Sequence, residues 1–393
     1  MLLELVLLLI LGILAGTITG LTPGIHINLV SGLLLAAPTT GLNPVYLVTF
    51  IVAMSITHTF LDFIPSVFLG CPDTDTELSI LPGHSFLKDK RGYEAVHLSN
   101  IGSILAIVIL LVIFIPAIFL MKNFNSVITG LIPYLLIVVS FIIIFTEKNK
   151  LKALFAFLLT GFLGYALSAF QFNQPLLPLL TGLFGASNII ISIKSKTEIP
   201  PQEITKTKVE LKRPIVGAAI SAPFCSFLPG VGSGQAAVIG NTFIKNDQRQ
   251  FLVLLGIVNT LVMGFSFISL YALGKTRTGT ADALKQLVGS INLNYLVLIL
   301  IITILTGFVA FQWSETLAKF FAVRFKKLNY RLLSYSTLVI LVIIVLLVSG
   351  IVGILILIIS TLTGIYCIKL GVKRTNMMGS LIIPTILFYF GIV

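Results

Sequence analysis

Long apolar segments separated by short polar turns occupy nearly the whole chain. Full-length apolar segments cover 44–70, 96–121, 127–146, 151–169, 175–193, 250–272, 290–311, 331–348, 351–370 and 377–393. A helix needs about 20 predominantly apolar residues to cross the hydrocarbon core of a bilayer. The pattern therefore predicts an all-α, polytopic protein of the cell membrane with about ten transmembrane helices.

Two further apolar segments, 2–37 and 214–242, are interrupted by Pro-Gly motifs. These motifs read "LTPGIHINLV" at 21–30 and "SFLPGVGSGQAA" at 226–237. As single helices the two segments would measure roughly 54 Å and 43 Å, against a hydrocarbon core of about 30 Å. Irregular backbone at membrane depth persists only where protein or a water-filled cavity satisfies its polar groups. Each segment is therefore either one broken span or a re-entrant hairpin that turns at its Pro-Gly.

The composition supports a membrane protein and argues against nucleic-acid binding. Of the 393 residues, 57% are hydrophobic and 10% are charged, with a formal net charge of +12. Soluble domains carry about 25% charged residues. The basic residues lie in short loops beside apolar segments, and no basic face alternates with aromatic residues, so we expect no nucleic-acid partner.

The distribution of Lys and Arg distinguishes the hairpin from the broken span. If 214–242 returns to its starting side, one face of the membrane holds loops 71–95, 147–152, 194–213, 243–249, 312–331 and 369–376. That face then carries every Lys and Arg except Lys122, Lys275, Arg277 and Lys285. A crossing segment would divide them far more evenly. The positive-inside bias therefore favours the hairpin and a cytoplasmic position for loop 194–213.

Four sequence matches at an offset of 202 to 206 residues indicate an internal repeat. Pro23-Gly24 recurs as Pro229-Gly230, and "DTDTE" at 73–77 recurs as "KTRTG" at 275–279. "LLTGFLGYAL" at 158–167 resembles "TLTGIYCIKL" at 361–370, and "PLLTGLFG" at 178–185 resembles "PTILFYFG" at 384–391. We divide the chain into a first transmembrane repeat (1–193), a cytoplasmic basic linker (194–213) and a second repeat (214–393). Five spans and one hairpin per repeat make the second repeat inverted, an organisation common in transporters.

The Pro-Gly motifs predict an anion site. A helix that begins just after Pro-Gly directs unpaired N–H groups and the positive end of its dipole at one spot. Glycine lets a ligand approach the backbone closely. The residues expected to bind substrate are Pro23, Gly24, His26, Asn28, Pro229, Gly230, Gly232, Ser233, Gly234 and Gln235. The structural alternative is that both motifs are kinks for close helix packing.

The repeated Pro-Gly element also resembles a known family, the large membrane subunit of the tripartite tricarboxylate transporters. The resemblance includes the Pro-Thr pair in "LAAPTT" at 35–40 and the stretch "LPGHSFLKDKRGYEAV" at 81–96. It implies uptake of a carboxylate anion driven by an ion gradient, with a small membrane subunit and an extracytoplasmic binding protein as partners. The segment "THTFLDF" at 57–63 departs from the family pattern.

Ionisable residues within apolar surroundings are candidates for ion coupling and gating. His58 and Asp62 share one helix face and could bind a proton together, or they could be a structurally satisfied pair. Asp73 and Asp75 lack the glycine and glutamate of a calcium loop, which leaves a solvated acidic turn, a cation site or a gate. Lys275 and Arg277, at the mirrored turn, could attract an anion or could simply be solvated.

The sequence favours a secondary transporter, in which an organic anion, a di- or tricarboxylate, binds between two broken helices near the bilayer midplane. Its coupling ion would be Na⁺ or H⁺. The protein would also contact membrane lipids. The alternatives are a transporter of a lipid-linked phosphate and a membrane enzyme acting on an anionic lipid. We find no catalytic constellation, metal-ligand spacing, Walker motif or other cofactor signal, so we expect no enzyme, metal or cofactor. The three cysteines are scattered, and the oligomeric state is open.

Overall fold

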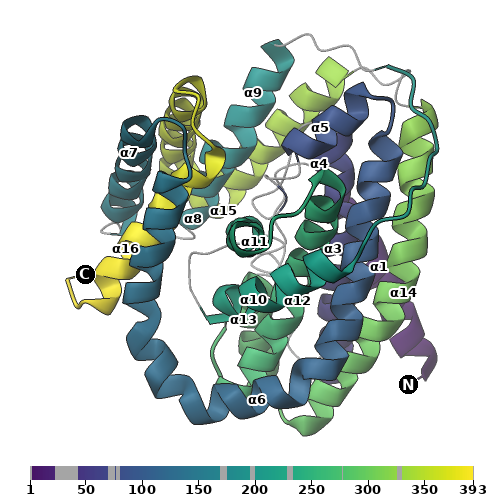
Figure 1. Ribbon diagram of the computed structural model, residues 1–393. Helices are drawn as coiled ribbons and strands as arrows, with labels where there is room; N and C mark the ends of the chain where they lie inside the picture. Colours follow the sequence, from purple (N-terminus) through teal and green to yellow (C-terminus); the bar gives the residue numbers. More distant parts are fainter. Residues whose placement is uncertain are drawn as a thin grey trace.

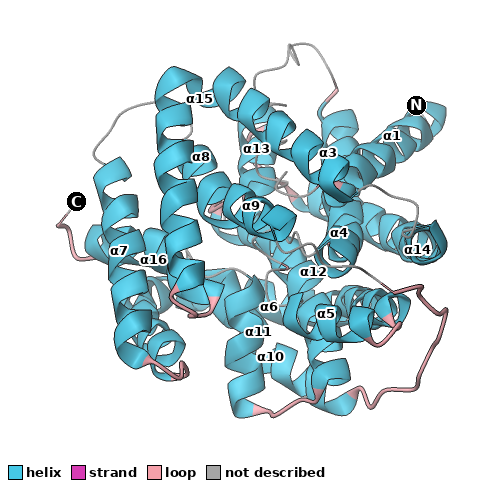
Figure 2. Ribbon diagram, turned by 90° about the horizontal axis from the view of Figure 1, so that it is seen from above, coloured by secondary structure: helices cyan, strands magenta, loops and turns pink. Residues whose placement is uncertain are grey.

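The computed structural model describes residues 2–22, 43–69, 76, 80–168, 175–194, 200–227, 233–276, 278–324 and 330–392. These residues form helices and turns without a strand (Figure 2), so the all-α class is confirmed. Seven of the helices described here are long and apolar enough to cross a membrane, and shorter apolar helices cover Gly130–Phe145 and Leu176–Ile191. The chain is a multi-pass membrane protein, and the count of about ten spans stays a prediction.

The helices before residue 200 follow the apolar segments closely. They are α1 (Leu2–Leu21), α3 (Pro44–Leu61), α4 (Phe63–Leu69), α5 (Ile80–Lys88), α6 (Gly92–Phe145), α7 (Lys150–Ser168), α8 (Leu176–Leu180), the π-helix η2 (Thr181–Ala186) and α9 (Ser187–Lys194). Segments 96–121 and 127–146 were expected as separate helices. They are the two arms of α6, which bends along the bottom of Figure 1.

A second set of helices lies after residue 211. They are α10 (Lys212–Phe227), α11 (Ser233–Phe243), α12 (Gln248–Leu273), α13 (Gly279–Val288), α14 (Leu293–Arg324), α15 (Tyr330–Lys369), the 3-10 helix η4 (Arg374–Met378) and α16 (Gly379–Tyr389). Within α15, Gly350 has φ 65° and ψ −161°. It therefore separates the two helices that the sequence places at 331–348 and 351–370.

Helix boundaries recur at nearly the offset of the sequence matches. Helices α1 and α10 end at residues 21 and 227, and α3 and α12 begin at residues 44 and 248. Helices α6 and α14 begin at residues 92 and 293, and α7 and α15 end at residues 168 and 369. Four helix boundaries thus recur in the described parts of the two halves, and the internal repeat stays a prediction.

Helices α1 and α3 run in the same direction. A Cβ added at Gly12 would lie 2.6 Å from Phe50 O, and one at Gly20 would lie 2.8 Å from Leu61 Cβ. Later residues of α1 therefore contact later residues of α3, as expected for two parallel helices. The start of α3 consequently lies near the start of α1. With 20 residues, α1 measures about 30 Å and is a full-length arm, not a half-helix.

Helices α10 and α11 form a short antiparallel pair. A Cβ at Gly240 would lie 2.7 Å from Gly217 O, at the ends of the two helices that are remote from the connection at 228–232. With 16 and 11 residues, they measure about 24 Å and 16 Å, each less than the roughly 30 Å of a hydrocarbon core.

Two pairs of helices, each with one member from either half, run in opposite directions. On α3 and α12, Thr59 contacts Thr260, whereas Val48 and Leu270 belong to one buried cluster near the other ends of these helices. On α6 and α14, Asn100 contacts Ser314, and Gly307 meets Ile107 one to two turns away.

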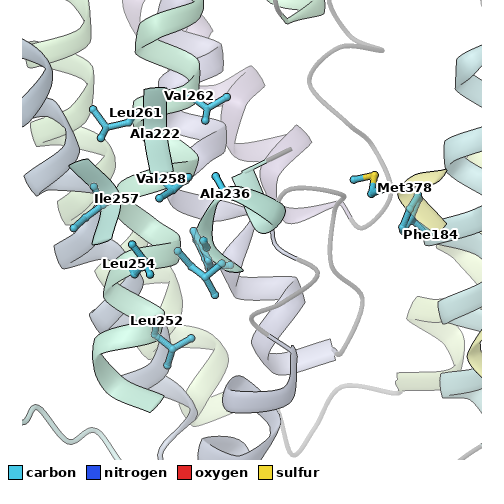
Figure 3. Close-up of a cluster of buried hydrophobic side chains, with 14 of the residues drawn as sticks. Phe184, Ala222, Ala236, Leu252, Leu254, Ile257, Val258, Leu261, Val262 and Met378 are labelled. Carbon is cyan, nitrogen blue, oxygen red and sulfur yellow. The ribbon is translucent and has the colours of Figure 1, made fainter. Parts of the chain in front are cut away.

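Helix α12 is the centre of the core. It begins with a capping box between Asp247 and Gln250 and ends at Gly274, whose φ of 62° suits glycine. Figure 3 shows its side chains Leu254 and Val258 in one cluster with Ala236 of α11. In both ribbon views α7, α8, α15 and α16 lie on one side of this core, and α1, α3 and α14 lie on the other (Figures 1 and 2).

One close crossing between the halves is the packing of α6 on α12. A Cβ at Gly102 would lie 2.2 Å from Val253 O, and a Cβ at Gly256 would lie 2.0 Å from Ser99 O. Both glycines are therefore required by space, because the two backbones touch.

Two polar contacts mark the opposite ends of the molecule. Residues 200–211 form an extended segment, which we call the strap, between α9 and α10. The strap crosses the start of α6, where Glu203 N donates to Lys90 O at 2.8 Å. We call this the strap end. At the opposite end, where α6 bends and α12 finishes, Lys275 Nζ donates to Asn125 Oδ1 at 3.1 Å.

The glycine face of α1 gives a test of close packing. A Cβ at Gly16 would lie 2.4 Å from Met54 O, so Gly16→Ala should force α1 away from α3 and cost about 1–3 kcal/mol. Gly130, on α6, has nothing within 4 Å of an added Cβ, so Gly130→Ala should be neutral or stabilising by up to about 1 kcal/mol. Thermal unfolding of the detergent-solubilised variants measures both. Equal melting temperatures would contradict the α1–α3 contact.

Candidate functional site

Asp62 lies where one apolar helix is interrupted. Helix α3 ends at Leu61 and α4 begins at Phe63, inside a single candidate span of 25 residues. Pro65 has no N–H, so the Leu61 carbonyl cannot receive its helical hydrogen bond, which accounts for the interruption. The Asp62 side chain is only 2% exposed. A carboxylate at this depth therefore depends on partners within the protein.

The main described partner of Asp62 comes from the other half of the chain. Asn259 Nδ2 donates to Asp62 Oδ2 at 2.8 Å, and Ser233 Oγ donates to Asn259 Oδ1 at 3.5 Å. Asn259 is in the middle of α12, and Ser233 is the first residue of α11. We call these three residues the polar bridge, because they connect the interruption in the first half to the start of a short helix in the second.

Two threonines extend the polar bridge. The hydroxyl groups of Thr59 and Thr260 lie 3.1 Å apart, and Asn259 Nδ2 also approaches Thr59 O at 3.4 Å. All of these groups are buried. Their oxygen atoms suit a cation or a proton, whereas the N–H groups at the start of α11 suit an anion. A set of groups that suits a cation or a proton thus lies next to a set that suits an anion.

His58 and Asp62 have different described partners. His58 Nδ1 lies 3.1 Å from Thr19 Oγ1. The Thr19 hydroxyl also lies 3.1 Å from Gly16 O. The sequence placed His58 and Asp62 on one helix face as a pair. The described contacts link His58 to α1 and Asp62 to α12, and the pairing of His58 with Asp62 stays a prediction.

The described flanks of the two Pro-Gly motifs meet near the polar bridge. A Cβ at Gly20, one residue before the end of α1, would lie 3.4 Å from Asp62 N. On the other side, Ser233 directly follows segment 228–232. Gly234 is buried in the first turn of α11, and Gln235 is the next residue of that turn.

Other predicted site residues lie elsewhere or outside the described residues. Those outside are Pro23, Gly24, His26, Asn28, Asp73, Asp75, Pro229, Gly230, Gly232 and Arg277. Lys275 is exposed and follows the end of α12. It is sixteen residues beyond Asn259, about 24 Å along a helix. The structure therefore does not bring Lys275 to the polar bridge.

Sequence reasoning missed a second buried polar group, which we call the Glu315 cluster. Glu315 is 5% exposed on α14. Its carboxylate accepts from Tyr93 OH at 2.6 Å, His97 Nδ1 at 2.9 Å and Asn100 Nδ2 at 3.0 Å, and Lys206 Nζ lies 3.6 Å away. A lone carboxylate in an apolar segment, and a Tyr-His-Asn series at helical spacing, were the available signals.

Next to this cluster, Glu94 is also fully buried. It pairs with Arg91 at 2.5 Å and with Arg249 at 3.3 Å. The strap residue Thr207 donates to it as well. Across the described residues, no group of three or more His, Cys, Asp or Glu side chains could hold a metal ion.

Comparison with known proteins gives two matches. The model of the tripartite tricarboxylate transporter TctA family matches residues 6–379. The uncharacterized protein MJ1079 of Methanocaldococcus jannaschii is 34% identical over 395 residues, covering 97% of this chain and 98% of that protein. No solved structure matches.

The polar bridge predicts that Asp62 and Asn259 are energetically coupled. Asp62→Ala and Asn259→Ala should each cost about 1–3 kcal/mol, because each removes a partner from a buried polar group. The double variant should cost about 0.5–3 kcal/mol less than the sum. Thr49→Ala, also buried on α3, supplies the matched control and should be additive with Asn259→Ala. Thermal unfolding of the parent, the single variants and the double variant measures these changes in stability. Additive effects of Asp62→Ala and Asn259→Ala would rule out the coupling.

Proposed function

This chain belongs to the tripartite tricarboxylate transporter TctA family, and we propose that it works as an ion-coupled permease for an organic anion, a di- or tricarboxylate. The family is one of transporters, so the chain is the permease component of a transport system and not an enzyme. The proposed steps are binding of the anion between two broken helices near the bilayer midplane and its release on the other side by alternating access.

The polar bridge is the observation that carries this proposal. It connects the two halves of the chain inside candidate spans, at Asp62 on one side and Ser233 on the other. A transporter that alternates between two openings needs a binding site between its two moving halves. A buried set of donors and acceptors at that position supports a small polar ligand there.

For the anion, we propose a site at the start of α11. The first turn of this helix contains Ser233, Gly234 and Gln235, and its N–H groups and dipole favour negative charge. Residues 229–232 would complete the site from the preceding segment, with Gly24, His26 and Asn28 facing it from the other half. Residues 229–232, Gly24, His26 and Asn28 all lie outside the described part and enter this proposal from the sequence motifs alone.

For the ion, we propose the neighbouring set around Asp62 and His58. The Asp62 carboxylate and the hydroxyl groups of Thr59 and Thr260 lie within one buried group, and these oxygen atoms can take Na⁺ or H⁺. Placing a cation next to an anion site lets each ligand strengthen the binding of the other, because their charges attract at short distance in a poorly screened interior.

We also propose that the two halves are inverted repeats, each with a re-entrant hairpin. The recurring helix boundaries and the opposite directions of α3 and α12 support the inversion. The short antiparallel pair of α10 and α11 supports the second hairpin. The parallel course of α1 and α3 supports a first segment that returns to its starting side, although its first arm is full length. By family membership, a small membrane subunit and an extracytoplasmic binding protein are the proposed partners.

Ligand binding tests the proposed function directly. Citrate or succinate should raise the melting temperature of the purified protein, and Na⁺ or lower pH should increase the shift. Proteoliposomes should take up labelled citrate only with an ion gradient. Asp62→Asn keeps an acceptor for Asn259, so it should leave folding intact and reduce ion-dependent uptake at least tenfold. Stabilisation by polyprenyl phosphate, without any effect of carboxylates, would replace the proposal with transport of a lipid-linked phosphate.

Side-specific labelling tests the topology. Glu210 is exposed on the strap and Ser290 is exposed after α13, near the opposite end of the molecule. In a variant without native cysteines, Glu210→Cys should react with a membrane-impermeant thiol reagent only in inside-out vesicles, and Ser290→Cys only in intact cells. Reaction of both cysteines from the same side would contradict the inverted arrangement.

A further inference from the structure

The Glu315 cluster connects three parts of the molecule that are far apart in sequence. Tyr93, His97 and Asn100 come from α6, Glu315 comes from α14, and Lys206 comes from the strap. The first two helices belong to different halves of the chain, and the strap is the segment that joins those halves. A change of charge here therefore acts on all three elements at once.

Hydrogen bonding fixes the protonation pattern of the cluster. A carboxylate can only accept, so His97 Nδ1, at 2.9 Å from Glu315 Oε1, must carry a proton. Any further proton on His97 adds to Nε2 and converts the ring to imidazolium. Imidazole is the side chain that ordinarily changes charge between pH 5 and 8. The cluster thus contains one place where a proton can add without breaking a hydrogen bond of Glu315.

A proton added to His97 would change the balance of charge around Glu315. With His97 neutral, the charge of Glu315 is balanced by Lys206, which lies 3.6 Å away and is 53% exposed. An imidazolium at 2.9 Å would be a nearer counter-charge, and it would repel the lysine. Of the neighbouring charged groups, Glu94 pairs with Arg91 and Arg249, and Lys319, one turn after Glu315 on α14, is exposed. Protonation of His97 should therefore release Lys206 and loosen the strap.

The strap is positioned to respond to this change. Gln202 Oε1 accepts from Gly92 N at 2.8 Å, and Gln202 Nε2 donates to Leu87 O at 3.0 Å. These contacts hold the strap at its start, and Thr207 holds it on Glu94. Lys206 lies between these attachment points, and it is the strap residue that pairs with the α14 carboxylate.

Ser314 connects the same cluster to the interruption at Asp62. Its Oγ lies 3.0 Å from Asn100 Oδ1 and 3.1 Å from Phe60 O. A hydroxyl group has one proton, so Ser314 can donate fully to only one of these two acceptors at a time. Phe60 is two residues before Asp62. A shift of Asn100 within the cluster would therefore redirect Ser314 at the edge of the polar bridge.

From these contacts we propose that Glu315 and His97 form a proton-binding site at the strap end. Occupancy of this site controls how tightly the strap is held, through Lys206, and reaches the polar bridge through Ser314. The strap response is independent of any cargo, whereas its link to transport rests on the proposed function.

Fluorescence quenching of a label on the strap tests the site. Lys208→Cys, in the full chain with Cys71, Cys225 and Cys367 replaced by Ala, carries a pH-insensitive dye at an exposed strap position. We expect quenching by neutral acrylamide to rise at least twofold from pH 8 to pH 5.5. His97→Asn keeps a donor near the position of Nδ1 but cannot titrate, so it should abolish the rise. Lys206→Met should abolish it too.

The matched control is Lys212→Met, at an exposed lysine in the first turn of α10, which should keep the rise. An unchanged rise in His97→Asn, or no rise in the parent protein, would overturn the proposal. If His97→Asn does not fold, Lys206→Met decides the test, because its side chain is half exposed.

Ser314→Ala should keep the strap response while reducing the pH dependence of citrate uptake at least threefold. A strap response without citrate uptake would leave the proton site standing and remove the proposed cargo.

Discussion

The reciprocal glycine contact between α6 and α12 is the constraint on which the rest of the arrangement depends. At Gly102 and Gly256 the two backbones approach so closely that a methyl group on either one would meet the other chain at 2.2 Å or less. This contact fixes the position of α6 relative to α12 along their helix axes, and the two helices come from different halves. Asn259 follows Gly256 by about one turn, and Asn100 precedes Gly102 by two residues. The same crossing therefore presents Asn259 to Asp62 and Asn100 to Glu315.

The hydrogen bonds around the buried carboxylates follow from one physical requirement. Water is scarce between apolar helices, so a carboxylate there is stable only when protein donors surround it. Glu315 receives three side-chain hydrogen bonds, and Asp62 receives one from Asn259. Each set draws on both halves of the chain. A relative movement of the halves would disturb both sets together, which is a property expected of a transporter and not of a static scaffold.

Much of the fold could be predicted from local sequence, because hydrophobic length and Pro-Gly interruptions act locally. The end of α1 at Leu21 and the separation at Gly350 are of this kind. The site was predicted only in part. His58 and Asp62 were recognised as ionisable residues in an apolar segment, but their partners Thr19 and Asn259 are 39 and 197 residues away. No periodicity reveals pairings of that range, and Glu315 was missed for the same reason.

The long-range partner of Asp62 also has a consequence for the synthesis of the protein. Asp62 enters the membrane while Asn259 is still 197 residues from being made. At roughly 5–20 residues per second, that interval is about 10–40 s. During it, α3 is a helix with a buried acidic group and without its later partner α12. In the nascent first half the hydrogen bond from Asn259 to Asp62 is therefore still missing. Biogenesis, and not only transport, is a step at which changes near Asp62 can act.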